Sequence, residues 1–147
     1  MGEREVTDMM ISTRGRYALR MMVDLAEHGK EDWVPLKEIA ERQDISKKYL
    51  EQIIPVLNHA GLLRTSRGFQ GGYQLVKTPE DYTVGEILRA TEGSLSPVAC
   101  LEGGENPCPR QATCHTLPVW VGLQKVIDDY LDGVSLADLL AEHKQHR

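Results

Sequence analysis

Residues 36–73, LKEIAERQDISKKYLEQIIPVLNHAGLLRTSRGFQGGY, decide the fold. Apolar side chains recur at helical spacing in two segments of this stretch, and a tight turn at residues 43–45 separates them. Ser46 is a favoured N-cap residue, and Gly61 suits the left-handed conformation that ends many helices. We therefore expect a helix-turn-helix whose second helix runs from Ser46 to Gly61. A bend is expected at Pro55, because proline removes a helical hydrogen bond.

Two short segments of strand character follow this second helix. Residues 62–66 and 73–76 contain Leu, Thr, Tyr and Val, and the six residues between them, 67–72, include three glycines. Such a pattern predicts a β-hairpin with a tight tip. A helix-turn-helix followed directly by a glycine-tipped hairpin is the plan of the winged helix. The sequence therefore predicts a mainly α-helical protein with a small β-hairpin wing.

Helical patterns also lie outside this unit. Ser12 or Thr13 can cap a helix that ends at Gly29, and this helix precedes the helix-turn-helix. Thr83 and Ser135 can cap two later helices. The predicted order is therefore helix, helix-turn-helix, hairpin, helix, loop, long helix and a last short helix.

The chain divides into four predicted parts. An extension at residues 1–9 precedes the winged helix-turn-helix domain, which occupies residues 10–92. A loop at residues 93–117 is rich in proline and glycine and holds all three cysteines. Residues 118–147 form the long helix and the last helix, and Pro118 lies in the first turn, where its missing N–H does no harm.

Composition and charge narrow the classes of function. The 147 residues carry a net charge of −5, which is unusual for a protein that binds nucleic acid. Residues 10–30 and 37–68 each carry +2, however, whereas residues 77–147 carry −5. Neither a signal peptide nor a run of about 18 apolar residues occurs, so we expect a cytoplasmic protein without a membrane span. No catalytic motif occurs either, and we expect no enzymatic activity.

The start of the second helix carries residue types that bind DNA. A helix N-terminus attracts anions through its free N–H groups and its dipole, so a capped end with two lysines suits a phosphate. The amide of Gln52 matches the edge of an adenine. The candidates for DNA contact at this end are Ser46, Lys47, Lys48, Tyr49 and Gln52.

The tip of the hairpin supplies a second set of candidates. Arg67 suits a narrow minor groove, where the negative potential is strong. Gly71 and Gly72 let the backbone approach a ligand closely, because they have no side chain. The wing is therefore expected to bind DNA beside the helix.

Three cysteines, Cys100, Cys108 and Cys114, fall within fifteen residues. In a reducing compartment, thiols gathered in this way are expected to be reactive groups or metal ligands. The loop is too polar to be a core segment, and the lack of a CxxC pair is untypical of a structural zinc site. A sensory iron–sulfur cluster is the other interpretation, because thiolates are its standard ligands.

Four strings of sequence resemble the Rrf-two family of bacterial transcriptional regulators, of the IscR and NsrR type. They are STRGRYA at residues 12–18, YLEQ at 49–52, AGLL at 60–63, and RG with GGY within 67–73. The resemblance extends from about residue 10 to residue 140. It implies a homodimer paired through the long helix and a palindromic operator in double-stranded DNA.

The resemblance also implies roles for individual residues. Ser12 and Arg14 correspond to residues that contact phosphates. Residues 46–52 correspond to the segment that enters the major groove, and Arg67 to a residue that enters the minor groove.

An iron–sulfur cluster of the [2Fe-2S] type on the three cysteines follows from the same resemblance. Members of the IscR type place a histidine three residues after the third cysteine, where this chain has Leu117. His115, which directly follows Cys114, is the nearest substitute as fourth ligand. Glu102 and Glu105 are further candidates.

Two other positions depart from the family pattern. Members of the NsrR type take an acidic ligand from the first helix of the partner, where this chain has Arg16, which cannot ligate iron. The seven residues between Cys100 and Cys108 also exceed the five that are typical of the IscR type.

Together with these patterns, the resemblance implies a DNA-binding repressor that senses iron–sulfur status, redox state or nitric oxide through a cluster. The cysteine loop directly precedes the long helix. A change in the cluster is therefore expected to shift that helix and to alter the distance between the two DNA-binding domains of the dimer. The alternative is a cluster-free regulator of the same fold. Such a regulator responds through thiol oxidation or through a partner enzyme, as regulators of cysteine metabolism do.

Overall fold

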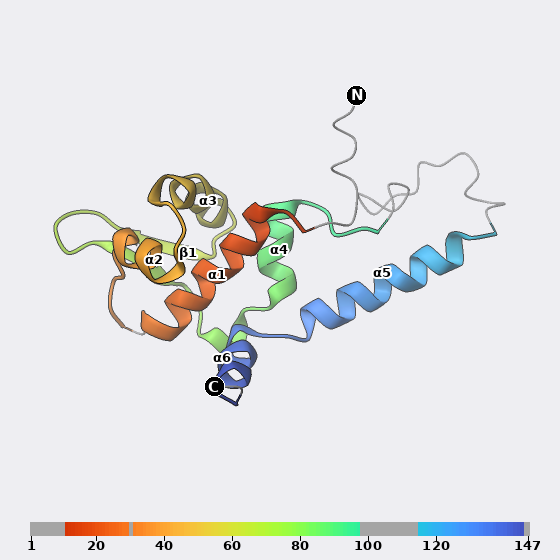
Figure 1. Cartoon of the computed structure of the whole chain (residues 1–147). Coiled ribbons are helices and arrows are strands. Elements are labelled where there is room, and N and C mark those ends of the chain that lie inside the picture. Colours follow the sequence, from red (N-terminus) through yellow and green to blue (C-terminus); the bar gives the residue numbers. More distant parts are fainter. Residues whose placement is uncertain (1–10, 30, 98–114, 146–147) are drawn as a thin grey trace, which may run out of the picture.

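The computed structural model describes residues 11–29, 31–97 and 115–145 (Figure 1). The elements in chain order are α1 (Thr13–His28), α2 (Leu36–Gln43), α3 (Lys47–His59), β1 (Leu63–Ser66), β2 (Gly72–Leu75), the 3-10 helix η2 (Pro79–Asp81), α4 (Val84–Glu92), α5 (Leu117–Asp132) and α6 (Leu136–Gln145). Helix α5 leads away from the body that the other elements form. The predicted mainly helical fold with a β-hairpin wing is confirmed.

Helix α1 is the central helix of the core. The Ser12 hydroxyl accepts a hydrogen bond from the N–H of Gly15 at 3.2 Å, so the predicted cap is confirmed. Gly29 ends the helix and donates its N–H to the Leu25 carbonyl at 2.8 Å. The buried side chains of α1 recur at intervals of three and four residues, which places them on one face; they include Ala18, Met21, Met22, Leu25 and Ala26.

The turn between α2 and α3 is held by its backbone. Asp44 adopts the left-handed conformation with a φ of 55°, which aspartate tolerates better than most residues. The Ile45 N–H donates to the Ala40 carbonyl at 3.1 Å, and the Ile45 side chain is buried. This turn sets the angle at which α3 leaves α2.

Helix α3 begins and ends as the sequence predicts. The Ser46 hydroxyl accepts a hydrogen bond from the Tyr49 N–H at 3.0 Å. Gly61, just after the helix, has a φ of 77° and donates to the Asn58 carbonyl at 2.9 Å. The helix continues through Pro55 as one element, and Pro55 is exposed.

Strands β1 and β2 form the wing. They pair antiparallel, with Leu63 opposite Leu75 and Ser66 opposite Gly72. Val34, just before α2, adds two backbone hydrogen bonds with Tyr73, at 3.0 and 2.9 Å. The wing is therefore fastened to the start of the helix-turn-helix.

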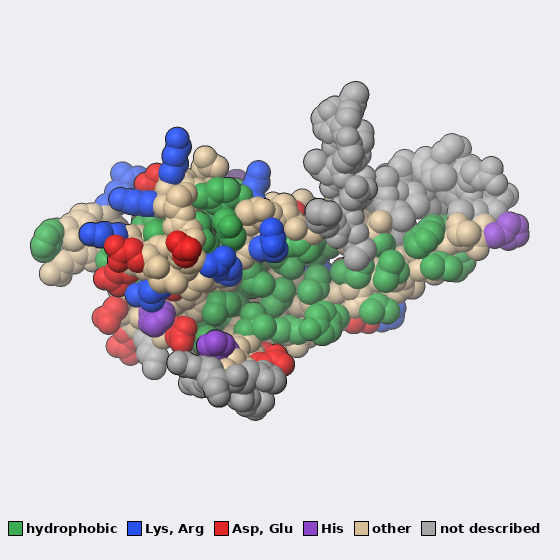
Figure 2. All heavy atoms as spheres, in the orientation of Figure 1, with side chains coloured by type: hydrophobic (Ala, Val, Ile, Leu, Met, Phe, Trp, Pro, Cys, Tyr) green, Lys and Arg blue, Asp and Glu red, His purple; other side chains and the backbone are tan. Residues whose placement is uncertain are grey.

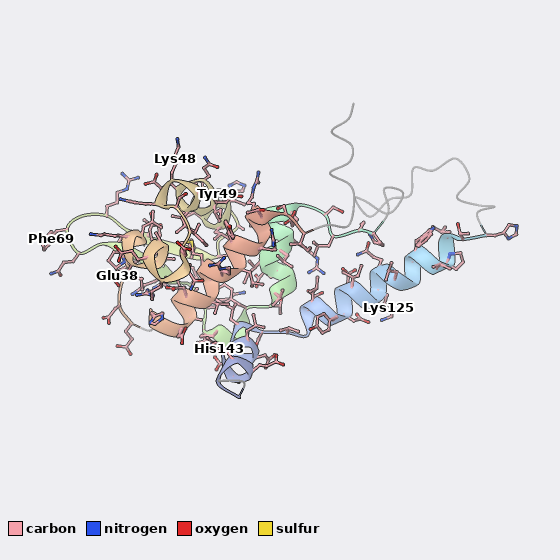
Figure 3. All side chains as sticks on the ribbon, in the orientation of Figure 1. Glu38, Lys48, Tyr49, Phe69, Lys125 and His143 are labelled. Carbon is pink, nitrogen blue, oxygen red and sulfur yellow. The ribbon has the colours of Figure 1, made fainter. Side chains whose placement is uncertain are left out.

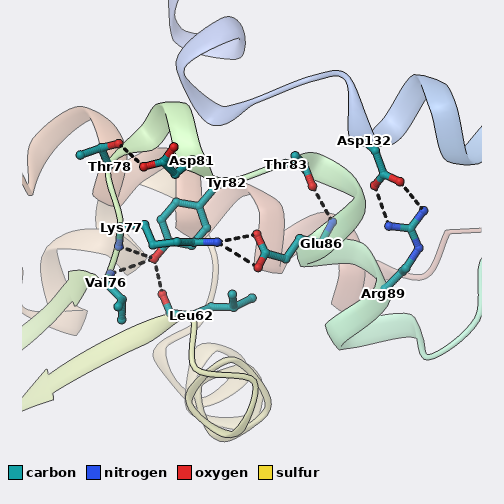
Figure 4. A network of polar contacts seen from close by, with 10 residues as sticks. All are labelled: Leu62, Val76, Lys77, Thr78, Asp81, Tyr82, Thr83, Glu86, Arg89 and Asp132. Carbon is teal, nitrogen blue, oxygen red and sulfur yellow. Dashed lines mark hydrogen bonds and ion pairs between the residues drawn. The ribbon is translucent and has the colours of Figure 1, made fainter.

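The strands exclude Leu62 and Val76, which the sequence analysis included, because Tyr82 engages the backbone of both residues. The hydroxyl of the fully buried Tyr82 donates to the Leu62 carbonyl at 2.7 Å and accepts from the Val76 N–H at 2.8 Å (Figure 4). The Lys77 ammonium lies 4.8 Å from the centre of the Tyr82 ring and bonds Glu86 of α4 at 3.0 Å. The base of the wing is thus tied to α4.

Helix α6 packs on the core. Leu136 is fully buried, and its N–H donates to the Tyr82 carbonyl at 3.1 Å. The predicted cap at Ser135 is present, because its hydroxyl accepts from the Asp138 N–H while the Asp138 carboxylate accepts from the Ser135 N–H, both at 2.9 Å. Helix α6 lies against α1 and η2.

Helix α5 has no fully buried side chain. Its C-terminal half is held to α4 by Arg89, which donates to Asp132 at 2.7 Å and to Asp128 at 2.9 Å. The hydrogen bond to Asp132 raises the pKa of Arg89, against the opposing effect of partial burial. Gly85 makes room for this contact, because a Cβ there would overlap the Asp132 carboxylate. None of the helices in the described ranges is long and apolar enough to cross a membrane.

Candidate nucleic-acid interface

The N-terminus of α3 presents two lysines to solvent. Lys47 and Lys48 are exposed, and Lys48 points away from the body of the domain (Figure 3). The first turn of α3 contains no acidic residue that would neutralise them. The dipole of α3 adds to their positive charge at the same end. This end of the helix is therefore suited to bind an anion.

Tyr49 and Gln52 differ in what they contact. Tyr49 is half-buried, and its ring meets that of Tyr17 edge-on at 5.3 Å. The Arg20 guanidinium lies 5.3 Å from the centre of the Tyr17 ring. Gln52 is exposed, about one turn further along α3. Tyr49 thus anchors α3 on α1, while Gln52 is accessible to a base.

The wing presents Arg67 on a tight loop. The Arg67 side chain is exposed. A Cβ on Gly71 would overlap the Ser66 carbonyl oxygen, and a Cβ on Gly72 would overlap the Val34 carbonyl oxygen. Both glycines are predicted DNA contacts. In the structure, their lack of a side chain lets the hairpin turn back tightly and pack on the segment before α2.

A groove of about 610 Å³ lies between the wing and the face of α3 that runs from Lys47 to Asn58, and it reaches the start of α2. Blue side chains lie over this part of the molecule, with red ones among them (Figure 2). Four residues predicted from the sequence share the groove, so a helix end and a hairpin tip form one surface. Those four are Lys47, Arg67, Gly71 and Gly72, and other lining residues include Lys37, Glu51, Asn58, Thr65 and Phe69.

Sequence reasoning missed two residues of this groove. Glu51 follows Lys47 by four positions, which places both on one face of α3, and a carboxylate there can accept from the amino group of cytosine. Phe69 is the only phenylalanine of the chain and lies among turn glycines, a position from which its exposure could have been inferred.

The start of α1 is occupied by a carboxylate. Ser12 donates its hydroxyl to Glu92 at 2.7 Å and its backbone N–H to the same oxygen at 2.9 Å. Gly15 makes this possible, because a Cβ there would overlap the Glu92 carboxylate. Arg14, which the sequence analysis paired with Ser12 as a phosphate contact, is exposed. The structure thus gives Ser12 an intramolecular partner and leaves the Arg14 side chain in solvent.

An ion pair holds the helix-turn-helix on α1. The fully buried Asp24 accepts hydrogen bonds from Arg42 at 2.8 and 3.0 Å and from the Gln43 amide at 2.9 Å. Arg20 reaches the side chain and the carbonyl of Gln43. The hydrogen bond to Asp24 raises the pKa of Arg42, although burial opposes the rise. The C-terminus of α2, and with it the turn into α3, is fixed by these contacts.

The cysteines Cys100, Cys108 and Cys114 lie outside the described residues. His115 is described, and its side chain is exposed two residues before α5 begins. Within the described ranges, no group of three His, Cys, Asp or Glu side chains could hold a metal ion. A metal site with His115 would therefore include residues outside the described ranges.

Helix α5 carries a stripe of exposed apolar side chains. Val119, Leu123, Val126 and Tyr130 follow one another at intervals of four, three and four residues, which is the spacing of a coiled-coil seam. Val126 is 63% exposed and Tyr130 is 68% exposed. The described chain does not cover this stripe.

Comparison with known proteins places the chain in a family. The profile of the Rrf2 family, described as "Iron-dependent Transcriptional regulator", matches residues 11–142. Protein rrf2 of Nitratidesulfovibrio vulgaris (strain Hildenborough) is 45% identical over 135 residues, which are 91% of this chain and 89% of that protein.

Two solved structures have the same fold. T. potens IscR superposes with a TM-score of 0.74 at 40% identity, over 94% of this chain and 90% of that chain. CymR (YrzC), the Global Cysteine Regulator of B. subtilis, superposes with a TM-score of 0.73 at 38% identity, over 90% and 97%. With its helix-turn-helix and wing on one surface, the chain belongs to the Rrf2 family of DNA-binding transcriptional regulators, a family that is not enzymatic.

Proposed function

We propose that this regulator is a cytoplasmic homodimer that binds a palindromic operator and represses transcription in response to iron–sulfur status, redox state or nitric oxide. The observation that carries the DNA-binding part is the groove between α3 and the wing. Lys47 at the capped end of the helix and Arg67 on the hairpin both line it. Winged-helix proteins bind DNA with these two elements.

In the proposed complex, the first turns of α3 enter the major groove. Ser46, Lys47 and Lys48 lie near the phosphates, which the helix N-terminus and two ammonium groups attract. The exposed Gln52 amide reads an adenine edge. Arg67 enters the minor groove, and Arg14 adds a phosphate contact from α1.

The exposed stripe of α5 supports the homodimer. Four apolar side chains at seam spacing have no cover within the described chain, and a second copy of the helix presents a complementary stripe. A two-fold dimer places two α3 helices on two half-sites, which makes the operator palindromic.

The cluster part of the proposal rests on the chemistry of the donor set. Cys100, Cys108 and Cys114 offer three thiolates, and the exposed His115 offers an imidazole next to the third. A [2Fe-2S] cluster on these residues would supply a group sensitive to iron, oxidants and nitric oxide. His115 lies two residues before the helix proposed to form the dimer, so a change at the cluster would act close to the start of that helix.

A cluster-free regulator is the second candidate. The likeness to the B. subtilis Global Cysteine Regulator supports it, because that structure matches this chain nearly as closely as the IscR structure does. In this version the cysteines act as thiol switches, or a partner enzyme binds the regulator.

Band-shift assays on duplexes enriched from a random-sequence library test the DNA-binding part. Lys48→Ala should weaken binding to all sequences and reduce the slope of log Kd against log salt by about 1, because one phosphate contact is lost. Lys125→Ala is the matched control, since this exposed lysine lies on α5, away from the groove. A failure to enrich any duplex would contradict the proposal.

The absorption spectrum, iron content and acid-labile sulfide of protein prepared without oxygen test the cluster. Cys108→Ser should abolish all three signals, and His115→Ala should shift the spectrum. His143→Ala is the matched control, because His143 is equally exposed but lies on α6. Colourless wild-type protein without iron and sulfide would reject the cluster and leave the thiol-switch version.

A further inference from the structure

The tip of the wing carries an isolated aromatic ring. Phe69 is 99% exposed and points away from the body of the domain (Figure 3). It lies with Gln70 at the centre of a turn that the Gly71 N–H closes on the Gly68 carbonyl at 3.1 Å. Gly68 has a φ of 108°, a conformation that favours glycine. The backbone of the turn therefore holds the ring out into solvent.

The surroundings of Phe69 do not fit a protein partner. A stable protein interface buries about 800 Å² on each side, whereas one phenylalanine offers about 150–250 Å². The neighbouring tip residues, Gly68, Gln70 and Gly71, add no apolar side chain to the ring. A single planar ring has the shape to stack between two adjacent base pairs of DNA.

The charge around the ring favours DNA. Arg67 lies two positions before Phe69, and both residues line the groove that α3 shares with the wing. Lys37 and Lys47 line the same groove. DNA bound in this protein groove would place its own major and minor grooves next to the wing tip.

We propose that Phe69 inserts between adjacent base pairs from the minor groove and kinks the operator beside Arg67. This inference rests on the proposed DNA-binding function. Phenylalanine is among the side chains that act as such wedges. Arg67 holds the tip in the minor groove, and Gly71 lets the hairpin turn back tightly behind the ring, because a Cβ there would overlap the Ser66 carbonyl oxygen.

The wedge also gives the regulator a source of sequence preference. Pyrimidine–purine steps such as TA and CA unstack most easily. Operators should therefore carry such a step where the wing lies, although no side chain reads its bases by hydrogen bonds.

The test uses the full-length protein and the duplex enriched from a random library, with 2-aminopurine placed at successive positions under the wing. Wild-type protein should raise the 2-aminopurine fluorescence at one step. Phe69→Ala should abolish the rise and weaken binding about tenfold, the range expected for one stacked ring. Phe69→Leu should retain most of the rise, because leucine also acts as a wedge. Gln70→Ala is the control at the same tip and should behave as wild type.

Each other outcome overturns the wedge. Unchanged binding and fluorescence in Phe69→Ala, with wild-type protein still binding DNA, would reject the wedge and leave the proposed function intact. If Phe69→Ala binds more weakly but wild-type protein causes no rise in fluorescence, the ring lies along the wall of the DNA minor groove and does not insert between base pairs. If wild-type protein enriches no duplex, the proposed function fails, and the wedge fails with it.

Discussion

Helices α1 and α5 are each sixteen residues long and lie in opposite environments. Helix α1 contains eight hydrophobic residues and buries seven of its residues, including Gly15 and Asp24. Helix α5 contains nine hydrophobic residues and has none fully buried. The more apolar helix is thus the more exposed one.

This contrast separates two uses of apolar side chains. The apolar side chains of α1 hold the winged helix together within one chain. Asp24, a buried carboxylate on the same helix, fixes the turn into α3 through Arg42. Those of α5 contribute only partly to the core, through Ile127 and Leu131 near its C-terminal end. The stripe from Val119 to Tyr130 stays exposed in the described chain and is available to pack against another surface.

The largest expected effect is on the proposed dimer. Val126→Asp places two carboxylates in the seam, one from each copy, and should raise the dimer dissociation constant on the order of 1,000-fold. Sedimentation equilibrium measures this constant. Lys125→Asp is the matched control, because it adds the same carboxylate about 100° around the helix and should change the constant less than about fivefold. A dimer that survives Val126→Asp would show that α5 is not the seam.

Two leucines compare the core and α5 directly. Leu136→Ala removes a fully buried side chain and should lower the free energy of unfolding by about 3 kcal/mol at every protein concentration. Leu123→Ala alters a side chain that is 37% exposed in one chain, so its cost should appear only where the dimer forms. Urea unfolding at protein concentrations above and below the dimer dissociation constant measures both. If Leu123→Ala lowers the free energy of unfolding equally at all protein concentrations, Leu123 stabilises the single chain and not the dimer.

Two tyrosines give the smallest effect. Tyr82→Phe leaves the Leu62 carbonyl and the Val76 N–H without their partner and should cost about 1–3 kcal/mol of unfolding free energy. Tyr130→Phe removes a hydroxyl from a ring that is 68% exposed and should change stability by less than about 0.5 kcal/mol. Thermal unfolding followed by circular dichroism compares the two. A larger loss in Tyr130→Phe would mean that its hydroxyl is bonded across the dimer.

The local parts of the fold could be predicted from the sequence. Ser46, Thr83 and Ser135 act on N–H groups three residues away, so the residue type and its position are enough to place a helix start. Gly61 ends α3 for an equally local reason, because its positive φ favours glycine. The order of elements followed from these signals.

Contacts between distant residues could not be predicted. Tyr82 stands in a polar stretch, and only the packed structure shows that its hydroxyl limits both strands. The ion pair of Asp24 and Arg42 joins α1 and α2, and it could not be inferred from the spacing of the two residues in the sequence. The position of α6 on the core depends in the same way on where Leu136 meets Tyr82.

The candidate site divides similarly. The basic end of α3 and the arginine of the wing were predicted because each is a local motif. That Lys47 and Arg67 face one groove, and that Glu51 and Phe69 join them, depends on how the hairpin packs beside α3.

The carboxylate of Glu92 makes the start of α1 a place of competition. Ser12 has one hydroxyl proton, and it is donated to Glu92, so a DNA phosphate gains this donor only by displacing the carboxylate. Glu92 is the last residue of α4, at the boundary of the segment that carries the cysteines. Thermodynamic reciprocity then applies: whatever draws the end of α4 away from Ser12 favours phosphate there, and phosphate there favours the withdrawn α4 to the same degree. A DNA phosphate at Ser12 would therefore be coupled to the position of the end of α4 through this one hydroxyl proton.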